Sequence, residues 1–351
     1  MHNKQHLKKN IIPPPLKPGD QLQVIAPSGV LREMEAFEEG VEIWRSRGYQ
    51  VKIIPEIVDK WGYLAGEDEN RRRQLAMAWK DPECRGILCV RGGYGSTRLL
   101  ENWTWREEEE ADRQGNKGDM EEYSCTTLRP HSLQTNATYG TRLDTRYAVA
   151  PPYSSQTKWL IGFSDITALL WSLYNVGISG VHAPVLTTLA AEPNWSRQRL
   201  FDWVEGRSLP PLQGCGWGGG VVNGTLLPGN LTVATHLLGT PLQPNFDNVI
   251  LALEDVTEVP YRIDRLLTQW RMSGALQNVK GIALGRFSRC ESPPKIPSFT
   301  IEEVLRDRLG DLNIPIVSNL PFGHDGANAA LPVGMTVTLD AEQGRLDITP
   351  S

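Results

Sequence analysis

Apolar and polar positions alternate along the chain in short blocks of two kinds. Short apolar runs, such as 21–25, 51–54 and 86–90, have the length of buried strands. Between them, residues 34–48 and 68–80 carry apolar side chains at the spacing of an amphipathic helix. Strands that alternate with helices predict parallel β-α-β units with right-handed crossovers. In such sheets, ligands bind at the carboxyl ends of the strands.

The segment 158–174 predicts a strand, a sharp turn and a helix in immediate succession. Its apolar run stops at Gly162, Ser164 follows, and a helical pattern begins at once. Such a turn can lift Ser164 clear of the sheet and leave the backbone N–H of Asp165 free to bind negative charge. The Gly-x-Ser-x-Gly pattern of the α/β-hydrolases is incomplete, because its fifth residue is Ile166. Ser164 is therefore either a nucleophile or the N-cap of the helix.

A glycine-rich turn, Arg-Gly-Gly-Tyr-Gly-Ser at 91–96, follows the strand predicted at 86–90. Its glycines let backbone N–H groups approach a ligand, as an anion nest or as half of an oxyanion hole. The turn lacks the Gly-Lys-Ser/Thr ending of a P-loop and the Gly-x-Gly-x-x-Gly pattern of dinucleotide sites. The alternative is a tight strand-to-helix turn that only needs positive φ.

The pattern divides the chain into two α/β domains. Its regular alternation breaks over 101–157, which holds an acidic run and Ser/Thr/Asn-rich sequence; we expect a surface insertion there, with the glutamates on a solvated face. The C-terminal part is predicted to be mixed α/β and to end in an antiparallel hairpin. The expected divisions are a loose leader at 1–18, an N-terminal domain at 19–190 that contains the insertion, a linker at 191–215, and a C-terminal domain at 216–351.

Composition narrows the class of protein. With 40% hydrophobic and 22% charged residues, the 351-residue chain is typical of a globular protein. A net charge of -5 and a pI near 5.8 give no reason to expect a nucleic-acid partner, and no apolar run has the length of a membrane span or a signal peptide. The five cysteines are scattered without Cys-x-x-Cys spacing, which argues against a disulfide framework and a zinc site. We therefore expect a cytoplasmic protein.

A nucleophilic serine needs a base and a carboxylate that orients it. Among six histidines, His324 lies in a glycine-flanked loop, where functional side chains concentrate. Glu254 ends a continuous apolar strand, and a histidine partner would satisfy a buried acid there. The alternative is that Glu254 or Asp255 caps the following turn or pairs with an arginine of the next helix, Arg262 or Arg265.

Several motifs together resemble one family, the LD-carboxypeptidases, which also include the microcin C self-immunity peptidases. The resemblance runs from about Leu16 to the C-terminus, outside the insertion. The motifs occur in the family's order, at 91–96, 161–165, 229–231, 253–256, 261–265 and 321–324. The resemblance implies a flavodoxin-like, doubly wound parallel-sheet N-terminal domain joined to a smaller mixed α/β C-terminal domain, and it suggests a homodimer.

The resemblance also implies a serine peptidase with a Ser-Glu-His triad at Ser164, Glu254 and His324. Its oxyanion hole would consist of the backbone N–H groups of Gly93 and Asp165. No metal or organic cofactor is implied. The serine would come from the first domain and the acid and base from the second.

The activity implied is hydrolysis of the L,D-peptide bond that releases terminal D-alanine from a murein tetrapeptide, a small peptide substrate, during cytoplasmic cell-wall recycling. Arg91 is a candidate for binding the substrate's carboxylate, because a guanidinium matches that group bidentately, unless it forms an ion pair within its turn. Tyr94 is a second candidate substrate-binding residue. One alternative is a self-immunity peptidase that cleaves peptidyl or aminoacyl nucleotides; another is a non-catalytic ligand-binding module. Two departures from the family are His182-Ala183-Pro184, where it usually has His-Gly-Pro, and the insertion, which we expect to border the cleft.

Overall fold

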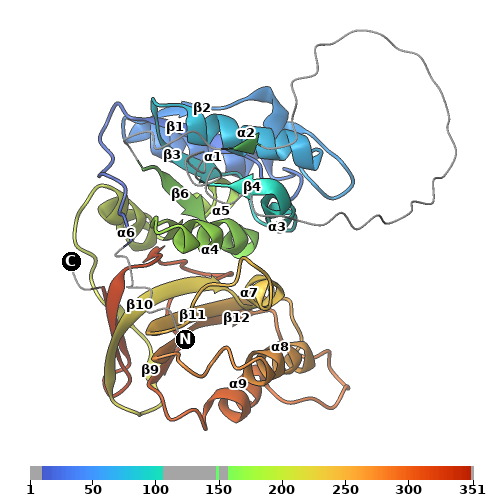
Figure 1. The fold of residues 1–351 in the computed structure, drawn as a ribbon, viewed down its shortest axis with the longest axis vertical. Coiled ribbons are helices and arrows are strands. Elements are labelled where there is room, and N and C mark those ends of the chain that lie inside the picture. Colours follow the sequence, from blue (N-terminus) through green and yellow to red (C-terminus); the bar gives the residue numbers. More distant parts are fainter. Residues whose placement is uncertain (1–9, 106–147, 150–156, 349–351) are drawn as a thin grey trace, which may run out of the picture.

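Two α/β domains are stacked on either side of helix α4 (Thr167–Asn175) in the computed structural model of the chain (Figure 1). The structure describes residues 10–105, 148–149 and 157–348. Most of the predicted insertion at 101–157 therefore lies outside the described residues. None of the helices in the described ranges is both long and apolar enough to span a membrane.

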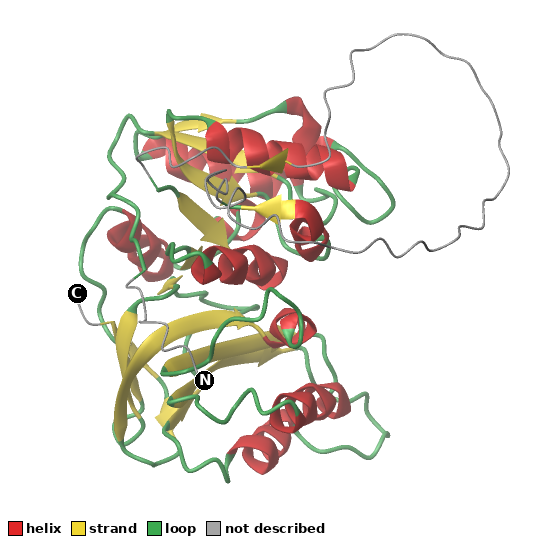
Figure 2. Ribbon diagram, in the orientation of Figure 1, coloured by secondary structure: helices red, strands yellow, loops and turns green. Residues whose placement is uncertain are grey.

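The first domain is built on a six-stranded sheet that is parallel except at one edge. Consecutive residues of its central strands enter different cores, so helices cover both faces, as Figure 2 shows. This confirms the doubly wound sheet. In sheet order the strands are β14 (Leu331–Pro332), β7 (Val181–His182), β6 (Trp159–Gly162), β3 (Cys84–Cys89), β1 (Gln21–Ile25) and β2 (Gln50–Lys52). On one face lie α1 (Met34–Ser46), α5 (Leu186–Leu189) and α6 (Asn194–Val204), and on the other α2 (Asp68–Lys80) and α4, while α3 (Ser96–Leu99) follows the glycine-rich turn.

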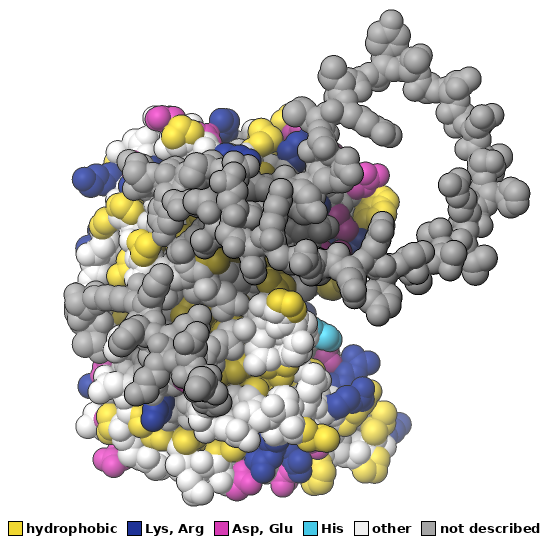
Figure 3. All heavy atoms as spheres, in the orientation of Figure 1, with side chains coloured by type: hydrophobic (Ala, Val, Ile, Leu, Met, Phe, Trp, Pro, Cys, Tyr) yellow, Lys and Arg dark blue, Asp and Glu magenta, His cyan; other side chains and the backbone are white. Residues whose placement is uncertain are grey.

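The second domain has an eight-stranded mixed sheet whose four central strands are parallel. In sheet order the strands are β8 (Leu212–Gln213), β16 (Arg345–Ile348), β15 (Thr336–Asp340), β10 (Val221–Asn230), β11 (Val249–Val256), β12 (Gly281–Ser288), β13 (Ile316–Ser318) and β9 (Cys215–Gly216). Its helices are α7 (Leu231–Leu237), α8 (Pro260–Met272) and α9 (Ile301–Leu309). Helix α8 begins at Pro260 and buries Ile263, Leu267 and Trp270 along one face. Both the proline start and the helical spacing of these apolar residues are visible in the sequence. Basic side chains gather on the surface near α8 and α9 (Figure 3).

Helix α4 joins the two domains through a shared apolar core. Trp171, in the middle of the helix, is buried, and its indole N–H donates to the carbonyl of Pro228, 2.9 Å away in β10. Its ring also lies 6.5 Å from that of Trp270 in α8. The hydroxyl of Thr167 accepts a 2.9 Å hydrogen bond from the backbone N–H of Asn230. The helix that follows Ser164 is thereby fixed against the second domain.

Described parts of three segments, predicted as a leader, a surface insertion and a linker, pack in the cores of the first domain. The predicted loose leader at 1–18 is anchored in its described part, where Leu16 is buried and donates its backbone N–H to the carbonyl of Val204. The insertion cannot begin at 101, because Trp103 and Trp105 belong to the core. The predicted linker at 191–215 contains α6, whose apolar face packs on the sheet. A single buried side chain such as Leu16 produces no detectable period in a sequence. Strand β4 (Trp103–Thr104), which contains the first of these tryptophans, pairs with β5 (Ala148–Val149).

Strand β14 crosses from the second half of the chain into the first sheet. Leu331 and Pro332 pair antiparallel with His182 and Val181 of β7. Strand β7 is therefore not the edge of the sheet. The loop before β14 carries His324, so this crossing brings that loop to the first domain.

Candidate active site

The turn at Ser164 has the strained backbone expected of an exposed nucleophile. Strand β6 ends at Gly162 and Phe163 is extended. Ser164, with a left-handed φ of 62°, begins a 3₁₀ turn (Ser164–Ile166) that leads into α4. A left-handed conformation costs a non-glycine residue about 1 to 3 kcal/mol. No side-chain capping hydrogen bond is present at the start of the 3₁₀ turn or of α4. The geometry thus favours the nucleophile over the N-cap.

The glycine-rich turn lies directly against Ser164. A Cβ added at Gly92 would lie 2.9 Å from the Cβ and 3.0 Å from the Oγ of Ser164, and 3.6 Å from the backbone N of Asp165. A larger residue at position 92 would therefore displace the serine or the turn. Gly93 has a φ of 117° and faces Gly29. Through Gly92, which was not a predicted site residue, the turn therefore lies next to Ser164 and the predicted donor Asp165.

The carboxylate of Asp165 ties three loops together. It accepts hydrogen bonds from the Ser28 hydroxyl (2.6 Å) and the Ser96 backbone N–H (2.8 Å). Burial raises the pKa of this carboxyl, while those hydrogen bonds oppose the shift. Ser28 follows β1 and Ser96 begins α3, so Asp165 fixes the glycine-rich turn relative to the serine.

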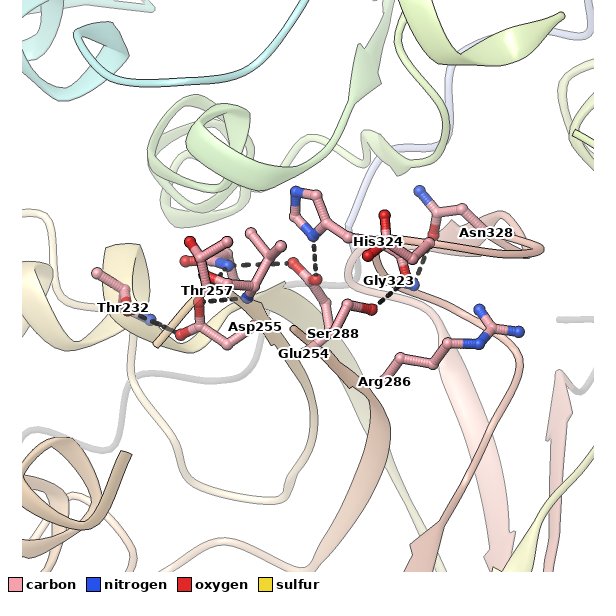
Figure 4. A network of polar contacts seen from close by, with 12 residues as sticks. Thr232, Glu254, Asp255, Thr257, Arg286, Ser288, Gly323, His324 and Asn328 are labelled. Carbon is pink, nitrogen blue, oxygen red and sulfur yellow. Dashed lines mark hydrogen bonds and ion pairs between the residues drawn. The ribbon is translucent and has the colours of Figure 1, made fainter. Parts of the chain in front are cut away.

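His324 and Glu254, the predicted base and acid, form a hydrogen bond with each other. The Nδ1 atom of His324 lies 2.7 Å from Oε2 of Glu254, which is fully buried at the end of β11 (Figure 4). Arg262, an alternative partner predicted for Glu254, instead pairs with Glu258, and Arg265 lies over Tyr261. A glycine is needed beside the pair, because a Cβ at Gly323 would come within 2.9 Å of the Glu254 side chain.

Asn230 contacts the carboxylates of both Glu254 and the neighbouring Asp255. Asn230 caps α7, since its Oδ1 accepts the Val233 N–H, and its amide nitrogen must therefore face the carboxylates. It donates to Glu254 (3.3 Å) and to Asp255 (3.1 Å). Asp255 also accepts from the backbone N–H and hydroxyl of Thr232 (Figure 4). The orientation of the acid is thus set by a helix terminus.

Aromatic rings connect the serine turn to the histidine loop. Phe163, next to Ser164 in the chain, packs on the imidazole of His324 with ring centroids 4.7 Å apart. The buried His182 contacts Phe163 at 5.8 Å and Phe322 at 6.2 Å. Neither ring nitrogen of His182 has a hydrogen-bond partner among the described residues. Its position favours a packing role for the His182 ring.

The environment raises the pKa values of His324 and Asp255 and lowers that of His182. Burial alone would lower the pKa of His324, but the hydrogen bond and charge of Glu254 outweigh it and raise that pKa. Burial lowers the pKa of His182 to about 4. Burial, followed by the charge of Glu254, raises the pKa of Asp255 to about 6. Glu254 therefore makes the imidazole of His324 more basic, while burial keeps the imidazole of His182 neutral near pH 7.

The two predicted substrate-binding residues lie at the rim of this region. Nη1 of Arg91 donates to the Val30 carbonyl (2.9 Å) and forms an ion pair with Glu33 (3.1 Å). Tyr94 is half exposed, and its ring lies 5.9 Å from that of Tyr63. Their role in binding stays a prediction. Among the described residues, no group of three or more His, Cys, Asp or Glu side chains is placed to hold a metal ion.

Comparison with known proteins identifies the family. The LD-carboxypeptidase N-terminal domain model matches residues 22–114, and the C-terminal domain model matches residues 223–339. A provisionally named carboxypeptidase of Synechocystis sp. is 51% identical over 341 residues, covering 97% of this chain and 98% of the relative. The chain belongs to the LD-carboxypeptidase family. This confirms the predicted family, and with it a serine-type carboxypeptidase, a hydrolase.

Other relatives bear more specific names. The murein tetrapeptide carboxypeptidase of Pseudomonas aeruginosa is 27% identical, covering 93% of this chain and 94% of its own. The crystal structure of muramoyltetrapeptide carboxypeptidase from Oxalobacter formigenes has a TM-score of 0.71 at 26% identity, covering 94% of this chain and 99% of its own. The microcin C7 self-immunity protein MccF has a TM-score of 0.75 at 18% identity, covering 96% and 98%. That last likeness shows the shared two-domain fold.

Several residues of the site were not predicted as functional, because their roles depend on contacts across the fold. Gly92 and Asn230 were noted only as parts of motifs, and Phe163 as the residue before the serine. For Asn230 a signal was available, since an asparagine directly before a helix is a common N-cap. No local signal marks the contact between Phe163 and His324.

Proposed function

We propose that the protein is an LD-carboxypeptidase that releases terminal D-alanine from murein tetrapeptide, in cytoplasmic cell-wall recycling, with Ser164, Glu254 and His324 as its triad. One observation carries the proposal: His324 bonds the buried Glu254 at 2.7 Å and packs on Phe163, the neighbour of Ser164. The substrate rests on the relatives named for murein tetrapeptide.

In this mechanism the bond from Nδ1 to Glu254 leaves Nε2 of His324 as the base. Nε2 takes the proton of the Ser164 hydroxyl as Oγ attacks the carbonyl before the terminal residue. The resulting imidazolium is stabilised by Glu254 and then donates its proton to the departing amine of D-alanine. Water, activated by the same imidazole, hydrolyses the acyl-enzyme and regenerates the serine.

Backbone donors stabilise the oxyanion of each tetrahedral intermediate. The N–H groups of Asp165 and Gly93 supply them in our proposal, supported by the contact of the glycine-rich turn with Ser164 and Asp165. In other acyl-transfer enzymes, one such donor contributes about 3 to 4 kcal/mol. Arg91 is proposed to bind the substrate's terminal carboxylate, and Tyr94 to contact the peptide at the rim.

The test is release of D-alanine from murein tri-, tetra- and pentapeptides, measured by mass spectrometry for the wild type and Ser164→Ala. We expect release from the tetrapeptide by the wild type and its loss in the variant. Activity that survives the substitution refutes the mechanism. A wild type that cleaves aminoacyl nucleotides but no murein peptide refutes the substrate and supports self-immunity; inactivity on every substrate favours a binding module.

A further inference from the structure

The loop that carries His324 is fixed from two sides. Residues 319–330 connect β13 to β14, and the second domain holds their first half. The Leu320 N–H donates to the Leu284 carbonyl (3.0 Å), the Phe322 carbonyl accepts from the Arg286 N–H (2.9 Å), and the hydroxyl of Ser288 donates to the His324 carbonyl. These contacts hold His324 relative to β12, in the second domain.

The second half of the loop is held by the first domain. Glu192, between α5 and α6, is 7% exposed, and its Oε2 accepts the backbone N–H of Asn328 at 2.8 Å. The side chain of Asn328 in turn accepts the N–H of Gly323 at 3.0 Å, so the loop closes on itself next to His324 (Figure 4). Glu192 thereby reaches the residue before the base through two hydrogen bonds.

Glu192 is a buried acid that connects the first domain to the loop of His324. A buried carboxylate is costly unless it is paired, and burial raises the pKa of Glu192, opposed first by the Asn328 N–H and further by the charge of Arg286. The segment that contains Glu192 packs on the same sheet as the Ser164 strand, whereas Asn328 belongs to the loop of the base. The contact therefore joins the serine's domain directly to the histidine's loop.

We infer that Glu192 is a positioning residue for the peptidase reaction: by accepting the Asn328 N–H it sets where His324 stands relative to Ser164. The inference rests on the proposed triad. It requires a hydrogen-bond acceptor of glutamate length at 192, and it does not require the negative charge.

Three variants separate these requirements. Glu192→Gln keeps an acceptor at the same reach, Glu192→Asp keeps the charge but is one methylene shorter, and Glu192→Ala removes both. Glu205→Ala is the matched control, because Glu205 is also a part-buried acid of this region but bonds Arg47 and Tyr49 within the first domain. Melting temperatures show which variants fold.

Two readouts are needed. For Glu192→Ala and Glu192→Asp we expect kcat for D-alanine release to fall by about 10- to 100-fold, with KM changed by less than about threefold, since a small displacement of a catalytic group costs that much. Glu192→Gln and Glu205→Ala should stay within about threefold of the wild type. The labelling rate of Ser164 by a fluorophosphonate, which needs no peptide, should follow the same order.

The inference is overturned if folded Glu192→Ala has the kcat of the wild type. It is also overturned if Glu192→Gln is as slow as Glu192→Asp, or if Glu205→Ala loses as much kcat as Glu192→Ala. If Glu192→Ala does not fold, the ranking of the glutamine and aspartate variants decides. A wild type that is labelled at Ser164 but releases no D-alanine refutes the proposed substrate, while the labelling rates still test Glu192.

Discussion

Gly92→Ala tests whether the glycine-rich turn sets the position of the nucleophile. The φ of Gly92 is not in the left-handed region, so alanine meets no backbone penalty there. Its methyl group would lie 2.9 Å from the Cβ and 3.0 Å from the Oγ of Ser164. Carbon atoms in contact prefer about 3.5 to 4.0 Å, so the serine or the turn must move by about 0.5 to 1 Å.

That displacement is large on the scale of catalysis. A shift of about 1 Å costs roughly 100-fold in rate, which corresponds to about 2.7 kcal/mol on the barrier. The free energy of unfolding should fall by only about 1 to 3 kcal/mol, the usual cost of one extra methyl group in a packed site. We therefore expect a folded protein with a large defect in kcat/KM.

The assay is kcat/KM for D-alanine release together with the fluorophosphonate labelling rate of Ser164. Gly62→Ala is the control, because Gly62 has a left-handed φ of 58° but nothing within 4 Å of its added Cβ. It should lose some stability and keep its activity. The reasoning is refuted if folded Gly92→Ala retains kcat/KM within about threefold of the wild type, a change too small for a shift of this size.

Two further predictions concern pH. Because Glu254 raises the pKa of His324 and the base must be neutral, kcat/KM should fall as pH drops through that raised pKa. Glu254→Gln should move this acidic limb of the pH profile to lower pH and reduce kcat by about 10³-fold or more. An acidic limb that does not move in the variant would contradict the pairing of the two residues. Burial lowers the pKa of His182 from 6.5 to about 4, so the unfolded chain takes up the proton first and stability is lost as pH falls through this window. We compare each variant with the wild type by its free energy of unfolding in urea. Between pH 7 and pH 4, this difference should shift by about 3 kcal/mol in favour of His182→Leu. For Phe322→Leu, which removes a ring but no titrating group, the difference should be the same at both pH values.

Local sequence determined the elements and the chemical identity of the site. Apolar runs and helical spacing depend on neighbours along the chain, so the alternating strands and helices of the first domain could be predicted, as could the helix that begins at Pro260. The turn at Ser164 was visible as the end of a strand followed at once by a helix. The ordered motifs then indicated the family and nominated Glu254 and His324.

The tertiary structure decided which of these residues meet. Glu254 and His324 are separated by 70 residues. They pair only because the parallel strands β11 and β13 end at the same edge of the second sheet, and the loop after β13 carries His324. The packing of α6, the return of β14 to the first sheet and the contact between Glu192 and Asn328 all depend on distant segments. Two-residue strands and single buried side chains leave no period in a sequence, because their stability comes from partners that the fold supplies.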